Sequence, residues 1–191
     1  MILRRKVTVK MGSKKIFLED TVENAAPTKS PLMILYHTNF GFPLIQDGSR
    51  LIIPSKRVVY GGTDEEVKNR DEYARFTDVS YDIDTPIYFH DVAEKDGCAG
   101  YAVVNDELGI GVRVRYLKKN FTNLINWVDQ QTGRNVVEVG PCNCTCLGRD
   151  RDRASSMLQF IEPGEVKEYK LSFEVLEGKD EIADADKEFT I

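Results

Sequence analysis

The most apolar segment of the chain reads 31-PLMILYHTNFGFPLI-45, and it carries two polar side chains, His37 and Asn39. The continuous apolar run 32-LMILYH-37 predicts a β-strand that is buried on both faces. A buried polar group costs about 1–3 kcal/mol unless a partner satisfies its hydrogen bonds. The segment therefore predicts either a structural partner for His37 or a pocket in which a ligand supplies one.

The rest of the chain also favours short strands. Residues 109–116 (GIGVRVRY) and 6–10 (KVTVK) alternate apolar and polar side chains, and residues 168–176 (EYKLSFEVL) continue the pattern. Glycine- and proline-containing turns separate these runs, which is typical of an all-β sandwich or barrel. The polar segment 64–73 is predicted to be a loop or a short exposed helix. We expect one β-domain over 1–176, followed by an acidic tail, 177–191, that is frayed or loosely packed.

Composition limits the classes of function. The chain has 191 residues and a formal net charge of −5, which argues against a nucleic-acid-binding protein. No apolar run reaches the roughly 18–20 residues that a membrane-spanning helix needs, and no signal peptide is recognisable. A cytoplasmic location is therefore expected, with the four cysteines present as free thiols. We expect no cofactor.

Eight sequence segments together resemble a known family. They are EDTVEN (19–24), the opening segment (31–45), GSRLIIP (48–54), IYFHD (87–91), GIGVRVRY (109–116), NW (126–127), GPCNCTCLGR (140–149) and IEPGE (161–165). In this order they resemble uncharacterised bacterial proteins related to aldose 1-epimerase (galactose mutarotase). The resemblance implies the C-terminal portion of a galactose mutarotase-like β-supersandwich, and a sugar as the small-molecule partner.

The resemblance suggests a role for the polar residues of the opening segment. Mutarotases carry a histidine in a similar segment as the general acid toward the sugar ring oxygen, and His37 matches that position, with Asn39 beside it as a sugar contact. An imidazole titrates near neutral pH and suits proton transfer in either direction. The alternative is a core histidine that donates a hydrogen bond to a backbone carbonyl.

The expected general base is where the sequence departs from the family. Alignment on Pro141 and Asn143 places Gly140 where relatives carry a glutamate. Glu138 lies two residues earlier, and residues i and i+2 of a strand share one face, about 6–7 Å apart. Glu138 is therefore the candidate replacement base. The alternative is a solvated strand residue.

Other candidate sugar contacts carry structural alternatives of equal weight. Trp127 suits stacking on a pyranose ring, or is a core or edge aromatic. His90 either bonds a sugar hydroxyl or lies exposed at a strand end. Arg149 offers a bidentate fork to hydroxyls, or pairs with a neighbouring aspartate at the surface. The resemblance also carries Asn143 over as a sugar contact.

The cysteine motif C-x-C-x-C comprises Cys142, Cys144 and Cys146. On a regular strand the three thiols would share one face. Structural zinc usually takes four ligands, and nothing in the sequence brings the fourth cysteine, Cys98, near the other three. We therefore predict that the motif binds no metal.

Two classes of function follow. The first is a carbohydrate-binding protein related to aldose 1-epimerases, with weak or absent isomerase activity. The second is a non-catalytic assembly module without a sugar site. They differ in whether His37, Trp127 and Arg149 converge on one surface. Under both hypotheses, half of a supersandwich leaves strand edges and apolar surface uncovered, so we expect a homo-oligomer or a partner chain that supplies the N-terminal half.

Overall fold

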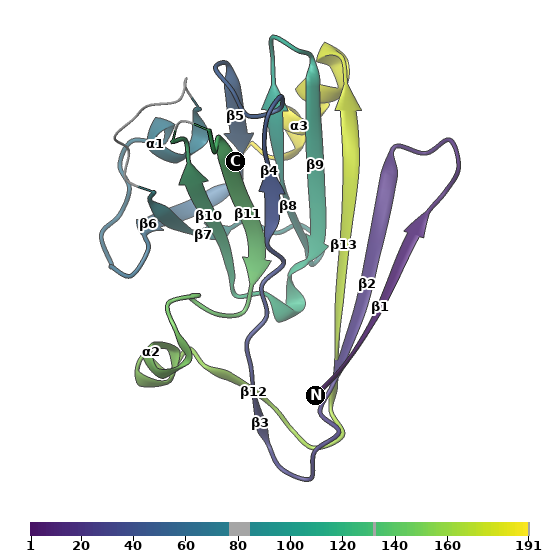
Figure 1. Cartoon of the computed structure of the whole chain (residues 1–191), viewed down its shortest axis with the longest axis vertical. Helices are drawn as coiled ribbons and strands as arrows, with labels where there is room; N and C mark the ends of the chain where they lie inside the picture. The colour runs from purple at the N-terminus through teal and green to yellow at the C-terminus, as the bar shows by residue number, and fades with distance from the viewer. Residues whose placement is uncertain (77–84, 132, 191) are drawn as a thin grey trace.

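The computed structural model describes residues 1–76, 85–131 and 133–190, and it is an antiparallel β-sandwich (Figure 1). One sheet has six strands in the order β1 (Ile2–Val9), β2 (Lys15–Glu23), β13 (Val166–Glu177), β9 (Ile110–Leu117), β8 (Cys98–Asn105) and β5 (Ser49–Ile52). The other sheet has five, in the order β4 (Thr38–Phe40), β11 (Val136–Cys142), β10 (Asn123–Asp129), β7 (Ile87–Val92) and β6 (Ser55–Tyr60). A third, two-stranded sheet pairs β12 (Gln159–Ile161) with β3 (Ser30–Leu32).

The main core lies between the two large sheets, and the alternation of β9 shows why. Val114 and Tyr116 are buried in that core, whereas Arg113 and Arg115 point to the opposite face. Across the core, the Tyr101 hydroxyl of β8 donates to the Val139 carbonyl of β11 at 2.7 Å. The predicted all-β class and the predicted sandwich are confirmed. No helix among the described residues is long and apolar enough to cross a membrane.

The opening segment does not form the predicted continuous strand. It leaves the small sheet after Leu32, makes a single bridge from Leu35 to Cys142, and joins the five-stranded sheet only at β4. The chain must pass from one sheet to another here, and this prevents one regular strand. Tyr36 and Phe40 are buried in the core, whereas His37 and Asn39 are exposed. The predicted strand that is buried on both faces is therefore wrong, and His37 is not the core histidine that the sequence left open.

The predictions for the two segments outside the expected strands have different outcomes. In the polar segment 64–73 and just beyond it, a short helix forms as α1 (Asp71–Ala74), and its Tyr73 is buried. The expected frayed tail is wrong, because α3 (Lys179–Glu188) is a regular helix packed on the outer face of the six-stranded sheet (Figure 1). Ile182, Ala185 and Phe189 recur at helical spacing and bury an apolar stripe that the acidic composition conceals.

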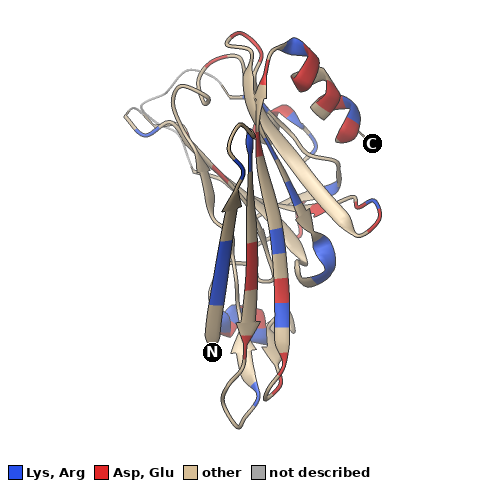
Figure 2. Ribbon diagram, turned by 90° about the vertical axis from the view of Figure 1, so that its right-hand side faces the viewer, with Lys and Arg blue, Asp and Glu red and all other residues tan. Residues whose placement is uncertain are grey.

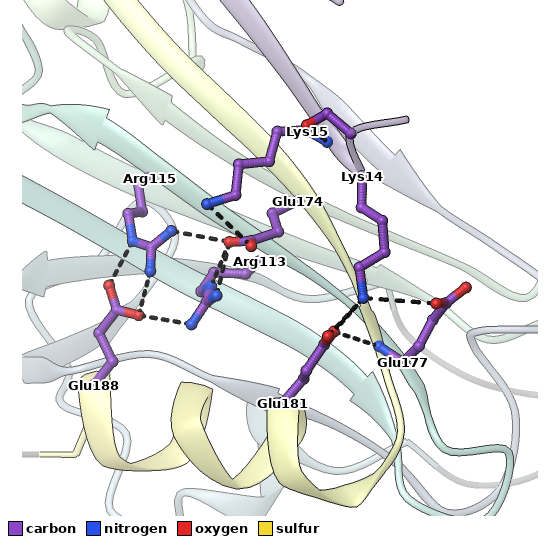
Figure 3. Close-up of polar contacts among 9 residues, drawn as sticks. Lys14, Lys15, Arg113, Arg115, Glu174, Glu177, Glu181 and Glu188 are labelled. Carbon is purple, nitrogen blue, oxygen red and sulfur yellow. Dashed lines mark hydrogen bonds and ion pairs between the residues drawn. The ribbon is translucent and has the colours of Figure 1, made fainter. Parts of the chain in front are cut away.

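Ion pairs attach α3 to the sheet (Figure 3). Arg113 lies between Glu174 of β13, at 2.7 Å, and Glu188 of α3, at 3.1 Å. Arg115 contacts the same two carboxylates, at 3.1 and 2.6 Å. Because two arginines share two carboxylates, the four side chains form a network that is more ordered than isolated surface pairs.

The basic cluster near the N-terminus is also paired within the protein. Figure 2 shows basic residues of β1 beside acidic residues of β2. Arg5 makes a bidentate contact with the buried Asp20, its Nη2 lying 2.7 Å from Oδ2. The outer pairs are Arg4–Glu23 and Lys6–Glu19. These partners neutralise the short basic run.

The β1–β2 hairpin extends away from the sandwich (Figure 1), and every residue of β1 is exposed. Leu3 and Val7 lie opposite Val22 and Leu18, which belong to the core or pack against it, so they extend the core-facing surface. Yet Leu3 is 54% and Val7 57% exposed. An uncovered apolar edge strand of this kind favours association.

We propose that the hairpin is covered by a second copy or by a partner chain. Light scattering at micromolar concentration is expected to return a dimer, and Val7→Lys should shift the protein toward monomer because it places a charge in the apolar contact. Thr8→Lys, on the opposite face of the same strand, is the matched control and should leave the mass unchanged. A monomeric wild-type protein would contradict self-association.

Candidate functional site

The outer face of the five-stranded sheet, turned away from the main core, carries the candidate site. Along β11 the buried core residues Val137 and Val139 alternate with Glu138 and Gly140, which point to this outer face. The strand register places Asn39 of β4 opposite Glu138, and Glu138 opposite Trp127 of β10. Directly opposed residues of an antiparallel pair share one face. Asn39, Glu138 and Trp127 thus form one cross-strand row, here called the Glu138 row.

Glu138 is the chemically unusual member of this row. Its side chain is buried, with 1% of the residue exposed, and its Oε1 has no hydrogen-bond partner among the described residues. Removal from water disfavours the charged form and raises the pKa of Glu138 to about 8. Glu138 is therefore not the solvated strand residue that the sequence left open. It is a carboxyl group that gains and loses its proton near neutral pH.

Gly140 provides the space that this carboxyl group uses. A Cβ atom at position 140 would collide with Glu138 Oε1, and would lie 2.5 Å from the Tyr36 carbonyl oxygen and 2.9 Å from Leu35 Cδ1. The site thus has no room for a side chain where the resemblance places a glutamate. The carboxyl group reaches the same region from position 138 instead.

His37 lies next to the Glu138 row without belonging to it. It comes one residue before β4 and is exposed on the same side as Asn39, since the alternate residues Tyr36 and Phe40 are buried in the core. Trp127 is partly buried. The structure therefore brings His37, Asn39, Glu138 and Trp127 to one face of the sheet.

His90 lies on the opposite side of this sheet. It is 2% exposed, its Nδ1 lies 2.9 Å from Ser55 Oγ, and its ring meets the Tyr73 ring edge-on, with centroids 4.9 Å apart. Burial lowers the pKa of His90 to about 3, so the imidazole is neutral at physiological pH. The predicted sugar contact is wrong for this residue, because its ring faces the core.

Asn143 and Arg149 also lie outside the Glu138 row. The Asn143 side chain accepts a hydrogen bond from the Ile34 N–H at 2.7 Å and donates to the Leu32 carbonyl at 2.9 Å, so it holds backbone instead of a ligand. Arg149 begins α2 (Arg149–Ala154) and is exposed. Neither neighbouring aspartate pairs with it: Asp150 binds Arg153 at 2.8 Å, and the buried Asp152 accepts from Thr145.

The sequence prediction missed the convergence of the cysteines. Of Cys142, Cys144 and Cys146, only Cys142 belongs to a strand. The chain bends after it, so the three thiols gather instead of following one strand face. Cys142 and Cys144 are buried beside Ile125 of the outer face. A signal for the bend was present in Gly148 and in the polar residues Asn143 and Thr145, which favour turns.

Comparison with known proteins assigns the chain to a family. The family described as "Domain of unknown function (DUF4432)" matches residues 1–175. The chain belongs to the DUF4432 family. No curated protein matches this DUF4432 chain.

Solved structures share the DUF4432 fold. A Klebsiella pneumoniae protein described as a "putative aldose 1-epimerase" superposes with a TM-score of 0.85 at 19% identity, over 98% of this chain and 53% of that one. A galactose mutarotase-like protein from Clostridium acetobutylicum gives 0.65 at 16% identity, over 92% and 56%. The Slr1438 protein of Synechocystis gives 0.68 at 14%, over 92% and 54%. The DUF4432 chain therefore has a mutarotase-like fold and spans about half the length of these structures.

Proposed function

We propose that this DUF4432 protein binds a sugar on the outer face of its five-stranded sheet, at the Glu138 row. The observation that carries the proposal is the buried carboxyl group of Glu138, whose Oε1 has no hydrogen-bond partner among the described residues. It lies in register between an amide, Asn39, and the chain's single tryptophan, Trp127. Sugars present hydroxyl groups to such polar atoms and an apolar C–H face to an aromatic ring. The mutarotase-like fold supports the same class of ligand.

The row and the neighbouring His37 together offer the two kinds of group that anomer interconversion requires. Opening a hemiacetal needs one group to protonate the ring oxygen and another to remove the anomeric hydroxyl proton. With a pKa of about 8, Glu138 is mostly protonated at pH 7, so it donates a proton readily and is a poor base. His37 is exposed at the same face and is the second proton-transfer group.

Mutarotase activity of the isolated chain is accordingly expected to be weak or absent. A well-positioned base contributes about 10²–10⁴-fold to such rates, and here the carboxyl group is largely in its acid form at neutral pH. Polarimetry on α-D-galactose and α-D-glucose measures this directly. Interconversion at full enzymatic rates, unchanged by Glu138→Gln, would overturn the assignment of the carboxyl group.

The sugar site itself is tested by binding. Titration with D-glucose, D-galactose and D-mannose should change the Trp127 fluorescence, because Trp127 is the single tryptophan and lies in the row. Asn39→Ala should weaken the affinity for sugar by up to about 10-fold, because it removes one hydrogen bond, which contributes about 0.5–1.5 kcal/mol.

Arg149→Ala is the matched control for this titration, since Arg149 is exposed and lies outside the row. It should leave the affinity unchanged. If no sugar of the panel binds, or if Arg149→Ala weakens binding as much as Asn39→Ala does, the proposed site is wrong.

A second candidate function rests on a different observation. The exposed apolar side chains of the β1–β2 hairpin favour an assembly module whose partner covers that edge. A dimer without sugar binding would support this alternative. We further propose a cytoplasmic location, which the four free cysteines support.

A further inference from the structure

Three thiols converge at the end of β11. The Sγ atoms of Cys142, Cys144 and Cys146 all lie within 4.8 Å of one another, and Cys144 Sγ is 3.5 Å from Cys146 Sγ. On a regular strand, neighbouring members of this set would be about 6–7 Å apart. The convergence requires Cys146 to adopt a left-handed backbone conformation with φ of 58°, which is uncommon for a residue other than glycine.

The segment that carries the thiols is held by hydrogen bonds from outside it. The Thr122 N–H donates to the Cys142 carbonyl at 3.0 Å, and Asn123 Nδ2 donates to the Cys144 carbonyl at 3.2 Å. The fully buried Asp152 accepts from the Thr145 N–H at 3.1 Å and from the Thr145 hydroxyl. A supporting shell of this kind fixes the orientation of potential ligands before any ligand binds.

We propose that Cys142, Cys144 and Cys146 bind one thiophilic metal ion, Cu(I) or Zn(II), as three thiolates. Zinc–sulfur bonds of about 2.3 Å in tetrahedral geometry place sulfur atoms about 3.8 Å apart, which is within the range of the observed cluster. Soft thiolate ligands select these ions over magnesium, calcium or manganese. Binding releases the thiol protons to solvent and changes no oxidation state.

The ligand set also defines the coordination. No fourth histidine, cysteine or carboxylate joins the cluster within the described part of the chain. Cu(I) would therefore be three-coordinate, whereas Zn(II) would keep an open fourth position for water or an exogenous ligand. Two of the cysteines are buried and the third is exposed, which gives an ion a path from solvent.

The test uses reduced protein under anaerobic conditions. Zn(II) binding is followed by displacement of Co(II), whose thiolate charge-transfer absorption reports sulfur ligands, and Cu(I) binding by competition with a chromogenic chelator. One equivalent of at least one of the two ions should bind. Tight binding of Cu(I) alone assigns the three-coordinate site, and Zn(II) binding with thiolate absorption assigns the four-coordinate one.

Cys146→Ser is the decisive variant, because this side chain is exposed and its loss leaves the core intact. Its metal affinity should fall by more than the roughly 10–100-fold typical of losing an outer-shell partner. Cys98→Ser is the matched control, an exposed cysteine outside the cluster, and should bind like wild type. Circular dichroism confirms that both variants are folded. Failure of wild type to bind either ion, or equal affinities of the two variants, would overturn the proposal.

Discussion

Replacing Glu138 with glutamine is expected to raise the free energy of unfolding by about 3 kcal/mol at pH 7 and to change it little at pH 4. In the folded protein the pKa of Glu138 is raised from 4.5 to about 8. Between these two values the folded state holds a proton that the unfolded state has lost. Stability is therefore fully present below about pH 4.5 and falls as the pH rises toward 8. Glutamine is neutral throughout and removes this loss, at about 1.4 kcal/mol per pH unit.

Urea unfolding at a series of pH values measures the effect, and a thermal shift of roughly 6–12 °C at pH 7 should accompany it. Glu168→Gln is the matched control, since Glu168 is exposed on β13 and its replacement should change stability by less than about 0.5 kcal/mol. If both variants behave alike at pH 7, Glu138 is solvated and ionised, and the candidate site loses its central group. If Glu138→Gln stabilises the protein and Glu168→Gln does not, the wild-type protein retains a destabilising carboxyl group at position 138, as proteins do at functional sites.

Gly140→Ala is expected to destabilise the protein by about 3 kcal/mol or more, at the upper end of overpacking effects. The added methyl group would meet the Tyr36 backbone oxygen at 2.5 Å as well as the Glu138 carboxyl group. A backbone atom cannot move aside as the end of a flexible side chain can. Gly140→Glu, which would place a carboxylate where the sequence resemblance expects one, should be more destabilising still and should not raise mutarotase activity.

Gly41→Ala is the matched control for this substitution. The nearest atom to a Cβ there is the Asn135 backbone oxygen at 3.8 Å, an ordinary contact, and Gly41 has no positive φ. The free energy of unfolding of the Gly41→Ala variant should differ from that of wild type by less than about 1 kcal/mol, in either direction. Urea unfolding compares the two variants, and equal stabilities would mean that the outer face of β11 is less crowded than described.

The fold was predictable because its signals are local. The alternation of 109–116 fixes which side of β9 faces the core, and the order of family-like segments indicates the mutarotase-like sandwich. The sequence did not indicate where the chain leaves one sheet and joins another. The segment 31–45 passes between two sheets, so its apolar run does not form one strand, and His37 becomes exposed.

The candidate site was predictable in part, for a related reason. Strand periodicity places Glu138 and Gly140 on one face, but burial of the carboxyl group depends on packing that no local pattern encodes. The same periodicity misplaces the cysteines, since it assumes that the strand continues beyond Cys142. The sequence allowed His90 to be an exposed residue at a strand end. In the structure its ring packs on Tyr73 of helix α1, a contact that strand periodicity cannot predict.

Helix α3 also acts as the counterion of the sheet that it covers. It begins after residue 175, where the match to the DUF4432 family ends, and carries five acidic and two basic residues. Its Asp186 and Glu188 face Arg50, Arg113 and Arg115. Without the helix, these guanidinium groups would be exposed beside the apolar side chains of Ile52 and Val104, and this face of the sheet would be both cationic and apolar. Helix α3 thus sets the charge of this side of the sandwich, and with it the electrostatic attraction of this side for anionic molecules.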